Sequence, residues 1–229
     1  MDALVMAGGL GTRLQPLTFS LPKPLLPVGG RPILEVLLRQ LQRGGFSRVF
    51  VSVGHKGHLV RSYLNELRLD GVEVACLSEE TPLGTAGALR LLPDDVGQLF
   101  VVNGDILSES DHAAVLRAHE AAGLSMTVVV HHHAVPLPYG VIELDGDFVS
   151  GIREKPTLHM PVATGMYALD VPRVLLELPE GRSDMPDLVL ALAARRQVRA
   201  QITQDFWTDV ADLADYERIE LDGERWAQP

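Results

Sequence analysis

The chain has 229 residues, with 20 basic and 30 acidic side chains and a formal net charge of −10. Nucleic acids and anionic membranes require a basic surface, so we expect neither as a partner. The first apolar run is too short for a signal peptide, and no stretch approaches the roughly 20 apolar residues of a membrane span. We therefore expect a soluble, cytoplasmic globular protein, and the sequence leaves open whether it forms a homo-oligomer.

Short apolar runs alternate with helical segments through the first half of the chain. Strands are predicted at residues 3–6, 48–53, 72–77, 98–102 and 125–131. Helices are predicted at residues 32–44, 56–67, 84–92 and 112–122. This alternation indicates a parallel sheet with helices on both faces, and substrates are expected at the carboxyl ends of its strands.

The pattern changes after residue 135. Residues 141–144 and 148–153 flank Asp-Gly-Asp, which predicts a β-hairpin. A further strand is expected at 163–169, an edge strand at 197–202, and helices at 185–195 and 211–221. Asp184 precedes the first of these helices and is predicted to cap it. Since no linker or repeat divides the chain, we expect a single domain over residues 1–229.

A glycine-rich loop with two nearby cations follows the first strand. Gly8, Gly9 and Gly11 leave backbone N–H groups uncovered, so the loop can wrap a phosphate closely. Arg13 offers a planar fork of donors, and Lys23 stands between two prolines that stiffen its tether. The loop lacks the lysine of a Walker A motif and the third glycine of a dinucleotide fingerprint. An ordinary turn would require neither cation, so the segment predicts a different kind of polyphosphate site.

Residues 8–18 and 22–24 closely resemble the signature of the sugar-1-phosphate nucleotidyltransferases, Gly-Gly-x-Gly-Thr-Arg-Leu-x-Pro-Leu-Thr followed by Pro-Lys-Pro. The resemblance implies an enzyme that joins a nucleoside triphosphate to a sugar 1-phosphate and releases pyrophosphate. It also implies a three-layer αβα, Rossmann-like fold of the glycosyltransferase-A type with a mostly parallel central sheet. Residues 1–135 would then form a nucleotide-binding half and residues 136–229 a sugar-binding lobe.

The same resemblance assigns residues to the nucleotide. It implies that catalysis depends on Arg13, Lys23 and Asp105. The positions implied to bind the nucleotide are Ala7, Gly8, Gly9, Leu10, Gly11, Thr12, Arg13, Lys23, Glu79, Glu80, Gly84, Thr85 and Asp105.

Two aspartates are candidate ligands for Mg²⁺, the cofactor that we expect. Asp105 follows Asn-Gly at the end of a predicted strand, where a carboxylate can hold Mg²⁺ over a phosphate. Asp209, in Trp-Thr-Asp, resembles the second metal ligand of the family, although Ala-Asp-Leu replaces the usual Gly-Thr-Pro after it. The alternatives are a turn role for Asp105 and a helix-capping role, which falls more naturally on Asp212 than on Asp209.

The acidic pair Glu79 and Glu80 bears on the choice of base. Its segment resembles most the base-reading segment of GDP-mannose-type pyrophosphorylases. Guanine presents N1–H and N2–H₂ as adjacent donors, and one carboxylate could accept from both, whereas uracil and thymine offer one donor. The pattern therefore favours GTP with a mannose- or heptose-like sugar, with a solvated acidic loop as the alternative for either glutamate.

The sugar phosphate is expected to contact the second half of the chain. Glu154-Lys155-Pro156 matches the family's Glu-Lys-Pro, in which the carboxylate accepts from sugar hydroxyls and the ammonium screens the phosphate. Gly140 and Thr164 lie in two further segments that resemble sugar-contacting motifs, although Ala163 replaces an asparagine. The predicted sugar-phosphate residues are Asn103, Gly140, Glu154, Lys155 and Thr164.

Other activities stay open at this point. The same fold carries uridylyl or thymidylyl transfer to glucose 1-phosphate or an amino sugar phosphate, and cytidylyl transfer to an alcohol phosphate. A catalytically silent subunit that senses nucleotide sugars belongs to a different class, and the complete set of Arg13, Lys23, Asp105 and Asp209 argues against it.

Overall fold

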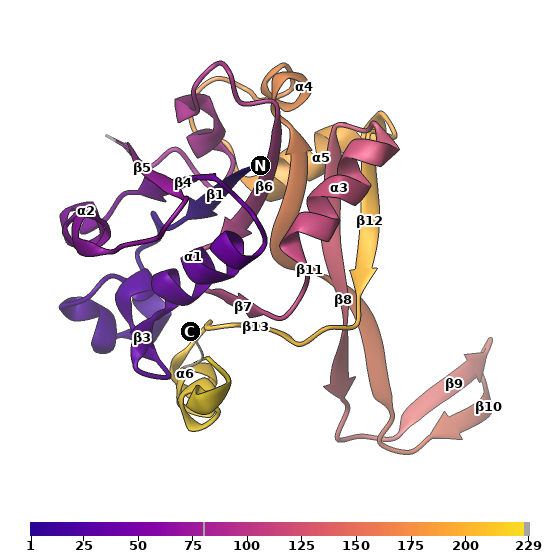
Figure 1. The fold of residues 1–229 in the computed structure, drawn as a ribbon. Helices are drawn as coiled ribbons and strands as arrows, with labels where there is room; N and C mark the ends of the chain where they lie inside the picture. Colours follow the sequence, from indigo (N-terminus) through magenta and orange to yellow (C-terminus); the bar gives the residue numbers. More distant parts are fainter. Residues whose placement is uncertain (80, 227–229) are drawn as a thin grey trace.

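The computed structural model describes residues 1–79 and 81–226, so Glu80 lies outside the described residues. Its centre is a seven-stranded sheet in the order β12-β8-β11-β6-β1-β4-β5, drawn in Figure 1. The strands of this sheet are β1 (Asp2–Met6), β4 (Arg48–Val53), β5 (Glu73–Ser78), β6 (Gln98–Asn103), β8 (Met126–Pro136), β11 (Thr157–Asp170) and β12 (Val198–Thr203). The edge position predicted for residues 197–202 is therefore confirmed.

Six helices surround the sheet within the described residues. They are α1 (Ile33–Arg43), α2 (Gly57–Glu66), α3 (His112–Ala122), α4 (Val171–Leu175), α5 (Met185–Ala194) and α6 (Leu213–Leu221). Residues 87–91 of the predicted helix at 84–92 form a 3₁₀ helix, η4 (Gly87–Leu91). Asp212 caps α6, since its carboxylate accepts from the backbone N–H of Asp215 at 3.0 Å. No helix in the described part of the chain has both the length and the apolar character needed to cross a bilayer.

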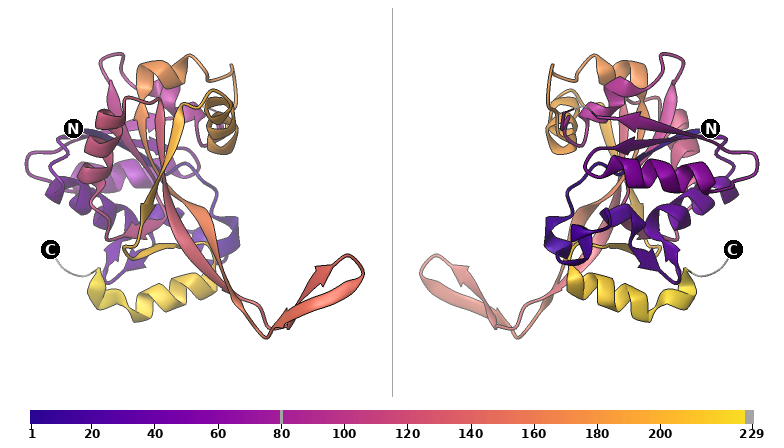
Figure 2. Two further views of the ribbon diagram at one scale, coloured as in Figure 1. Left: turned by 90° about the vertical axis from the view of Figure 1, so that its right-hand side faces the viewer. Right: turned by 90° about the vertical axis from the view of Figure 1, so that its left-hand side faces the viewer.

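Alternating side chains of the strands build two separate cores, one on each face of the sheet. On β1, Ala3 and Val5 pack with α1 and α3, whereas Leu4 packs with η4, α4 and α5. All three side chains are fully buried. A strand covered on both faces reads as a continuous apolar run, which is the pattern of a parallel sheet between helical layers. The three-layer αβα architecture with a mostly parallel sheet is thus confirmed (Figures 1 and 2).

One strand departs from the expected parallel array. β11 lies between β6 and β8 and is antiparallel to both, whereas β1, β4, β5 and β6 form parallel pairs. The segment at 125–131, expected to continue the parallel array, therefore pairs with a strand from the second half. The register of β11 shifts between Ala163 and Tyr167, at a position where Gly165 adopts φ of +75°. A register shift of this kind bends a strand locally, and β11 pairs with β8 on both sides of it.

Three smaller sheets surround the main one. β7 (Ile106–Ser108) pairs with β13 (Trp207–Asp209), and β2 (Pro27–Val28) pairs with β3 (Arg31–Pro32). The predicted hairpin is β9 (Val141–Asp145) with β10 (Phe148–Arg153), and it projects from the body on the long arms of β8 and β11 (Figure 2). β11 and β12 of the second half join the sheet of the first half, and the division into nucleotide and sugar halves stays a prediction.

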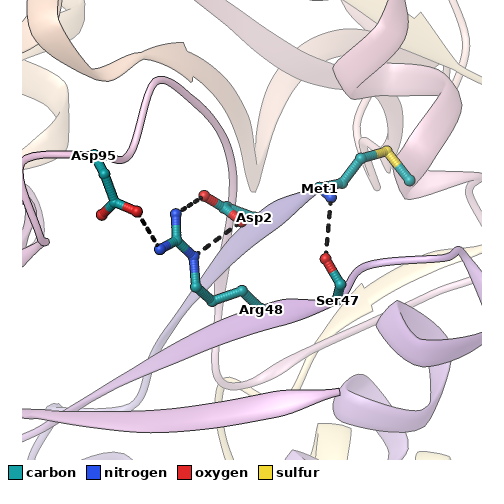
Figure 3. A network of polar contacts seen from close by, with 5 residues as sticks. All are labelled: Met1, Asp2, Ser47, Arg48 and Asp95. Atoms are coloured by element: carbon teal, nitrogen blue, oxygen red, sulfur yellow. Dashed lines mark hydrogen bonds and ion pairs between the residues drawn. The ribbon is translucent and has the colours of Figure 1, made fainter. Parts of the chain in front are cut away.

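An arginine at the start of β4 joins the amino ends of the central strands (Figure 3). The Arg48 guanidinium donates to both carboxylate oxygens of Asp2 on β1, at 3.2 and 2.5 Å. It also donates to Asp95, in the turn before β6, at 2.6 Å. These hydrogen bonds raise the pKa of Arg48 above its usual value. The contacts join β1, β4 and the turn before β6 at the end of the sheet opposite the carboxyl ends of these strands.

A buried histidine should make stability depend on pH. His112 is 4% exposed, its ring stacks on Phe100, and burial lowers its pKa to about 4 from 6.5. The unfolded chain therefore binds a proton more readily below pH about 6.5, and stability falls as the pH falls towards 4. We expect wild type to lose roughly 3 kcal/mol more than His112→Phe between pH about 7 and about 4, measured by urea unfolding. Parallel stability curves for the two proteins would contradict this.

Candidate active site

A cleft of about 710 Å³ opens where β1, β4, β5 and β6 end. Carboxyl ends of parallel strands are where ligands bind in open α/β sheets. Ten predicted residues line this cleft: Ala7, Gly8, Gly9, Leu10, Lys23, Glu79, Gly84, Thr85, Asn103 and Asp105. Residues separated by up to 98 positions in the sequence are thus brought to one place, from the glycine loop, the 3₁₀ turn that begins at Lys23, the segment that follows β5, and the end of β6 with the residues after it.

Close backbone packing forms the floor of the cleft. The backbone N–H of Ala7 donates to the carbonyl of Ser52 at 3.0 Å, which extends the pairing of β1 and β4 past the end of β1. A Cβ atom on Gly54 would lie 3.0 Å from the carbonyl oxygen of Gly8. On the other side, the backbone N–H of Gly104 donates to the carbonyl of Met6 at 2.8 Å. A Cβ on Gly104 would lie 2.9 Å from this carbonyl oxygen. Glycine at positions 54 and 104 permits these close approaches.

The glycine loop folds back onto the stem of Lys23. Gly11 adopts φ of +63°, and its carbonyl accepts from the Thr18 hydroxyl at 2.8 Å. A Cβ on Gly11 would lie 3.3 Å from Cβ of Lys23. Arg13 lies on a short 3₁₀ turn, Thr12–Leu14, and is exposed. In the described structure Gly11, Thr12 and Arg13 are therefore next to the cleft in sequence but do not line it.

Lys23 and Asp105 form an ion pair in the cleft. Their side chains are 12% and 27% exposed, so this pair is partly shielded from water. The ammonium contacts Oδ2 of Asp105, while Oδ1 is buried and has no hydrogen-bond partner in the described part of the chain. An unpaired buried carboxylate oxygen is costly unless a cation or donor reaches it. The donor set therefore suits a further cation at Asp105.

Asp209 comes close to Asp105 through the small sheet. It lies opposite Ile106 in the ladder of β13 and β7, and the N–H of Val210 donates to the carbonyl of Asp105 at 3.0 Å. Its carboxylate has no hydrogen bond or ion pair with any described residue. Across residues 1–79 and 81–226, no group of three or more His, Cys, Asp or Glu side chains could hold a metal. A metal at Asp105 would thus take most of its ligands from phosphate and water.

Glu79 joins two walls of the cleft. Its Oε2 accepts from the backbone N–H of Leu83 at 3.0 Å, and its Oε1 lies 3.0 Å from where a Cβ on Gly8 would be. The carboxylate therefore lies against the glycine loop. It also accepts a hydrogen bond from the start of the loop that carries Gly84 and Thr85. This contact supplies a structural role for Glu79, while the prediction that it reads a base stays a prediction.

The predicted sugar residues form a second group at the base of the hairpin. A Cβ on Gly140 would lie 3.0 Å from Oε2 of Glu154, so these two positions are adjacent. Lys155 follows with φ of +42°, a conformation that is uncommon outside glycine and that clusters at functional sites. All three are exposed. Among the described residues, no hydrogen bond or ion pair joins this group to Lys23 or Asp105.

The two remaining candidates for the sugar phosphate, Asn103 and Thr164, differ in whether they reach the cleft. Asn103 lines the cleft, and its Nδ2 would lie 2.6 Å from a Cβ on Gly165. Thr164 is fully buried, and its hydroxyl donates to the carbonyl of Val129 at 2.9 Å. Asn103 therefore lies at the cleft, whereas the hydroxyl of Thr164 is bonded inside the protein and gives its predicted role at the sugar no support.

The cleft also contains residues that the sequence did not indicate. Ser52 and His55 line it from the end of β4, and Arg182 and Asp184 line it from the segment before α5. Ser52 and His55 could have been predicted, because ligands bind at the carboxyl ends of the strands in open α/β sheets. Asp184 corrects a prediction: it occupies the N-cap position of α5 but makes no capping hydrogen bond. It accepts instead from the backbone N–H of Thr85 at 3.1 Å.

Comparison with known proteins places this cleft in a family. Residues 2–225 match the family described as Nucleotidyl transferase. The chain is 32% identical to the Oryza sativa subsp. japonica protein named "Probable mannose-1-phosphate guanylyltransferase 1", over 94% of this chain and 63% of that one. It therefore spans less than two thirds of that curated relative's length.

Two of the solved structures that match the chain share its fold as follows. One, from Bacillus anthracis, is provisionally named a glucose-1-phosphate thymidylyltransferase, with a TM-score of 0.78 and 23% identity over 98% of this chain and 95% of that one. The other is HddC from Yersinia pseudotuberculosis complexed with GMP-PN, with a TM-score of 0.71 and 23% identity over 96% of this chain and 98% of that one.

The fold defines a three-layer α/β protein with a glycine-lined cleft at the carboxyl ends of its parallel strands. The chain belongs to the nucleotidyl transferase family.

Proposed function

We propose that this protein transfers a guanylyl group from GTP to a mannose- or heptose-like sugar 1-phosphate, giving a GDP-sugar and pyrophosphate. The observation that carries the proposal is the partly shielded Lys23–Asp105 pair beside the glycine loop, in a cleft lined by ten of the predicted residues. A relative of 32% identity bears the name of a mannose-1-phosphate guanylyltransferase, which favours this reaction over thymidylyl or uridylyl transfer.

In this proposal the residues of the chain act by position and charge. The glycine loop presents backbone N–H groups to the triphosphate, and Lys23 neutralises its oxygens. Arg13 would have to turn in from the surface to reach the same phosphates. An oxygen of the sugar phosphate attacks the α-phosphorus in line, and pyrophosphate leaves. The residues require no covalent intermediate, since bringing the two substrates together supplies much of the acceleration.

Mg²⁺ fits this site as a proposed cofactor. Asp105, with its unpaired Oδ1, and Asp209, with its unpaired carboxylate, are the residues that would hold it. When bound, the ion would neutralise charge on the phosphate oxygens. The ammonium of Lys23 contacts Oδ2 of Asp105, which leaves Oδ1 for the ion. A cytoplasmic location and a homo-oligomer both stay predictions.

Glu79 is proposed to help select the base. A Glu79→Gln variant still offers an oxygen to the N–H of Leu83, so the loop contact is preserved while the charge is lost. A hydrogen bond to a charged acceptor contributes on the order of 1.5–3 kcal/mol, so kcat/KM with GTP should fall roughly 10- to 100-fold. The value with UTP should change little. An equal loss with every triphosphate would show that Glu79 only supports the loop.

The proposed function is tested by a substrate matrix. Purified protein is incubated with each of the four nucleoside triphosphates, with dTTP, and with a panel of sugar 1-phosphates, and pyrophosphate release is measured. We expect the highest kcat/KM for GTP with mannose 1-phosphate or a heptose 1-phosphate. Preference for UTP or dTTP would contradict the guanylyl assignment, and no release with any pair would support the sensing-subunit alternative.

A further inference from the structure

A clasp of hydrogen bonds joins two segments that lie about 100 residues apart in the sequence. We define the clasp as the contacts between residues 83–87 and residues 183–185. The backbone of Ser183 makes three of them. Its N–H donates to Leu83 at 2.8 Å, and its carbonyl accepts from Ala86 at 2.9 Å and from Gly87 at 3.2 Å. These backbone hydrogen bonds connect the loop after β5 to the segment before α5.

Two side chains complete the clasp in opposite directions. The carboxylate of Asp184 accepts from the N–H of Thr85 at 3.1 Å. The hydroxyl of Thr85 accepts from the N–H of Met185 at 2.7 Å. Thr85 therefore satisfies the free backbone donor at the first position of α5, whereas an ordinary N-cap side chain would accept from the second or third position. Residues 83–87 thus supply an acceptor for the start of α5, and Asp184 supplies an acceptor for the backbone of residues 83–87.

Gly84 makes this fit possible. It adopts φ of +82°, and a Cβ there would lie 2.4 Å from the carbonyl oxygen of Ser183 and 2.8 Å from Oδ1 of Asp184. Both distances are shorter than real contacts. The loop can therefore press against the segment before α5 only as glycine.

The clasp shapes the wall of the candidate nucleotide cleft. Gly84, Thr85 and Asp184 all line the cleft. At its other end the loop is held by Glu79, whose Oε2 accepts from Leu83. The loop is thus fixed from the first half of the chain at Glu79 and from the second half at Asp184. The hydrogen bond from Thr85 is the main cause that lowers the pKa of Asp184, so the carboxylate is charged at neutral pH.

We propose that Asp184 is a positioning residue for the nucleotide: it holds the Gly84–Thr85 wall of the cleft in the shape that accepts a nucleoside triphosphate. This inference deepens the proposed function and rests on it. It predicts that nucleotide affinity depends on a residue outside the predicted nucleotide-binding half, through the hydrogen bond from Thr85 to Asp184.

Three variants test the role of Asp184. Asp184→Ala removes the acceptor for Thr85, whereas Asp184→Asn retains an oxygen at the same place. Asp111→Ala is the matched control, because Asp111 caps α3 by accepting from the N–H of Ala114 at 2.8 Å and does not line this cleft. We expect Asp184→Ala to weaken GTP binding about 10-fold in calorimetric titration, with Asp184→Asn within about 3-fold of wild type. Binding of mannose 1-phosphate should not change.

Amide hydrogen exchange on the substrate-free protein supplies a second readout. Exchange at residues 85–87 should be about 10-fold faster in Asp184→Ala than in wild type, and unchanged in Asp111→Ala. GTP affinity unchanged in Asp184→Ala, or weakened equally in Asp111→Ala, would overturn the inference. Pyrophosphate release by the wild type is measured separately. If the wild type releases none while Asp184→Ala shows the expected changes in GTP affinity and amide exchange, the proposed reaction is refuted and the role of Asp184 is supported.

Discussion

An Asp105→Asn variant should lose on the order of 10³-fold in kcat at saturating Mg²⁺ while keeping its fold. The amide has the shape of the carboxylate and can still accept from Lys23, but it lacks the charge that would hold the metal at the buried Oδ1. The backbone contact between Asp105 and Val210 does not depend on the side chain, so the small sheet should remain paired. The measurement is steady-state turnover together with a thermal unfolding curve.

Asp94→Asn is the control for this change. Asp94 is exposed and lies before the start of β6, whereas Asp105 follows its end. The control removes the same charge without touching the cleft, so its turnover should match wild type. Near-normal turnover of Asp105→Asn at saturating Mg²⁺ would show that the carboxylate does not hold a required metal.

A Lys155→Ala variant should lose roughly 10- to 100-fold in kcat/KM for the sugar 1-phosphate, since a contact with a charged partner contributes about 1.5–3 kcal/mol. GTP binding, measured by calorimetry, should stay within about 2-fold of wild type. Lys155 lies at the base of the hairpin, and its ammonium makes no ion pair or hydrogen bond with the described residues. Its backbone is held at φ of +42°, which suits a residue kept for a ligand.

Arg153→Ala is the matched variant, because Arg153 is an exposed cation two residues earlier and is already paired with Glu143 at 3.0 Å. It should leave kcat/KM for the sugar phosphate close to wild type. A similar loss of kcat/KM in both variants would show that any positive charge near the hairpin has this effect and that Lys155 has no specific role. A loss of GTP affinity equal to the loss for the sugar phosphate would place Lys155 at the nucleotide.

Local patterns were enough to predict most of the elements. The strand at 48–53 and the helix at 112–122 have the bounds that their residue patterns indicated. The helix ends at Gly123 with φ of +64°, a conformation that other residues adopt at a cost. Such signals act within a few residues, so they can be read without knowing the rest of the fold.

Pairing between distant segments could not be read in the same way. The antiparallel entry of β11 between β6 and β8, and the joining of β13 to β7, depend on hydrogen bonds between segments up to about 100 residues apart. The backbone groups that make these bonds are the same in every sequence. The apolar run of β11 therefore indicated a strand but neither its neighbours nor its direction.

The site residues also differ in whether a local motif or a distant segment determines their role. Lys23, Asn103 and Asp105 were predicted because each belongs to a motif at a turn or strand end, and all three line the cleft. Asp184 was interpreted as a helix cap because its neighbour Thr85, 99 residues away, could not be foreseen. The roles of Glu154 and Lys155 stay predictions, since the hairpin that carries them projects away from the body (Figure 2).

The central claim, nucleotidyl transfer from GTP to a sugar 1-phosphate, is tested most directly by following phosphorus labels. Purified protein is given GTP labelled at the γ-phosphate or mannose 1-phosphate labelled at its phosphorus, and the products are separated. If the sugar-phosphate oxygen attacks the α-phosphorus, the label from GTP appears only in pyrophosphate and the label from the sugar phosphate appears only in a GDP-sugar. Label from GTP released as orthophosphate, or label from the sugar phosphate that never joins a nucleotide, would contradict the account.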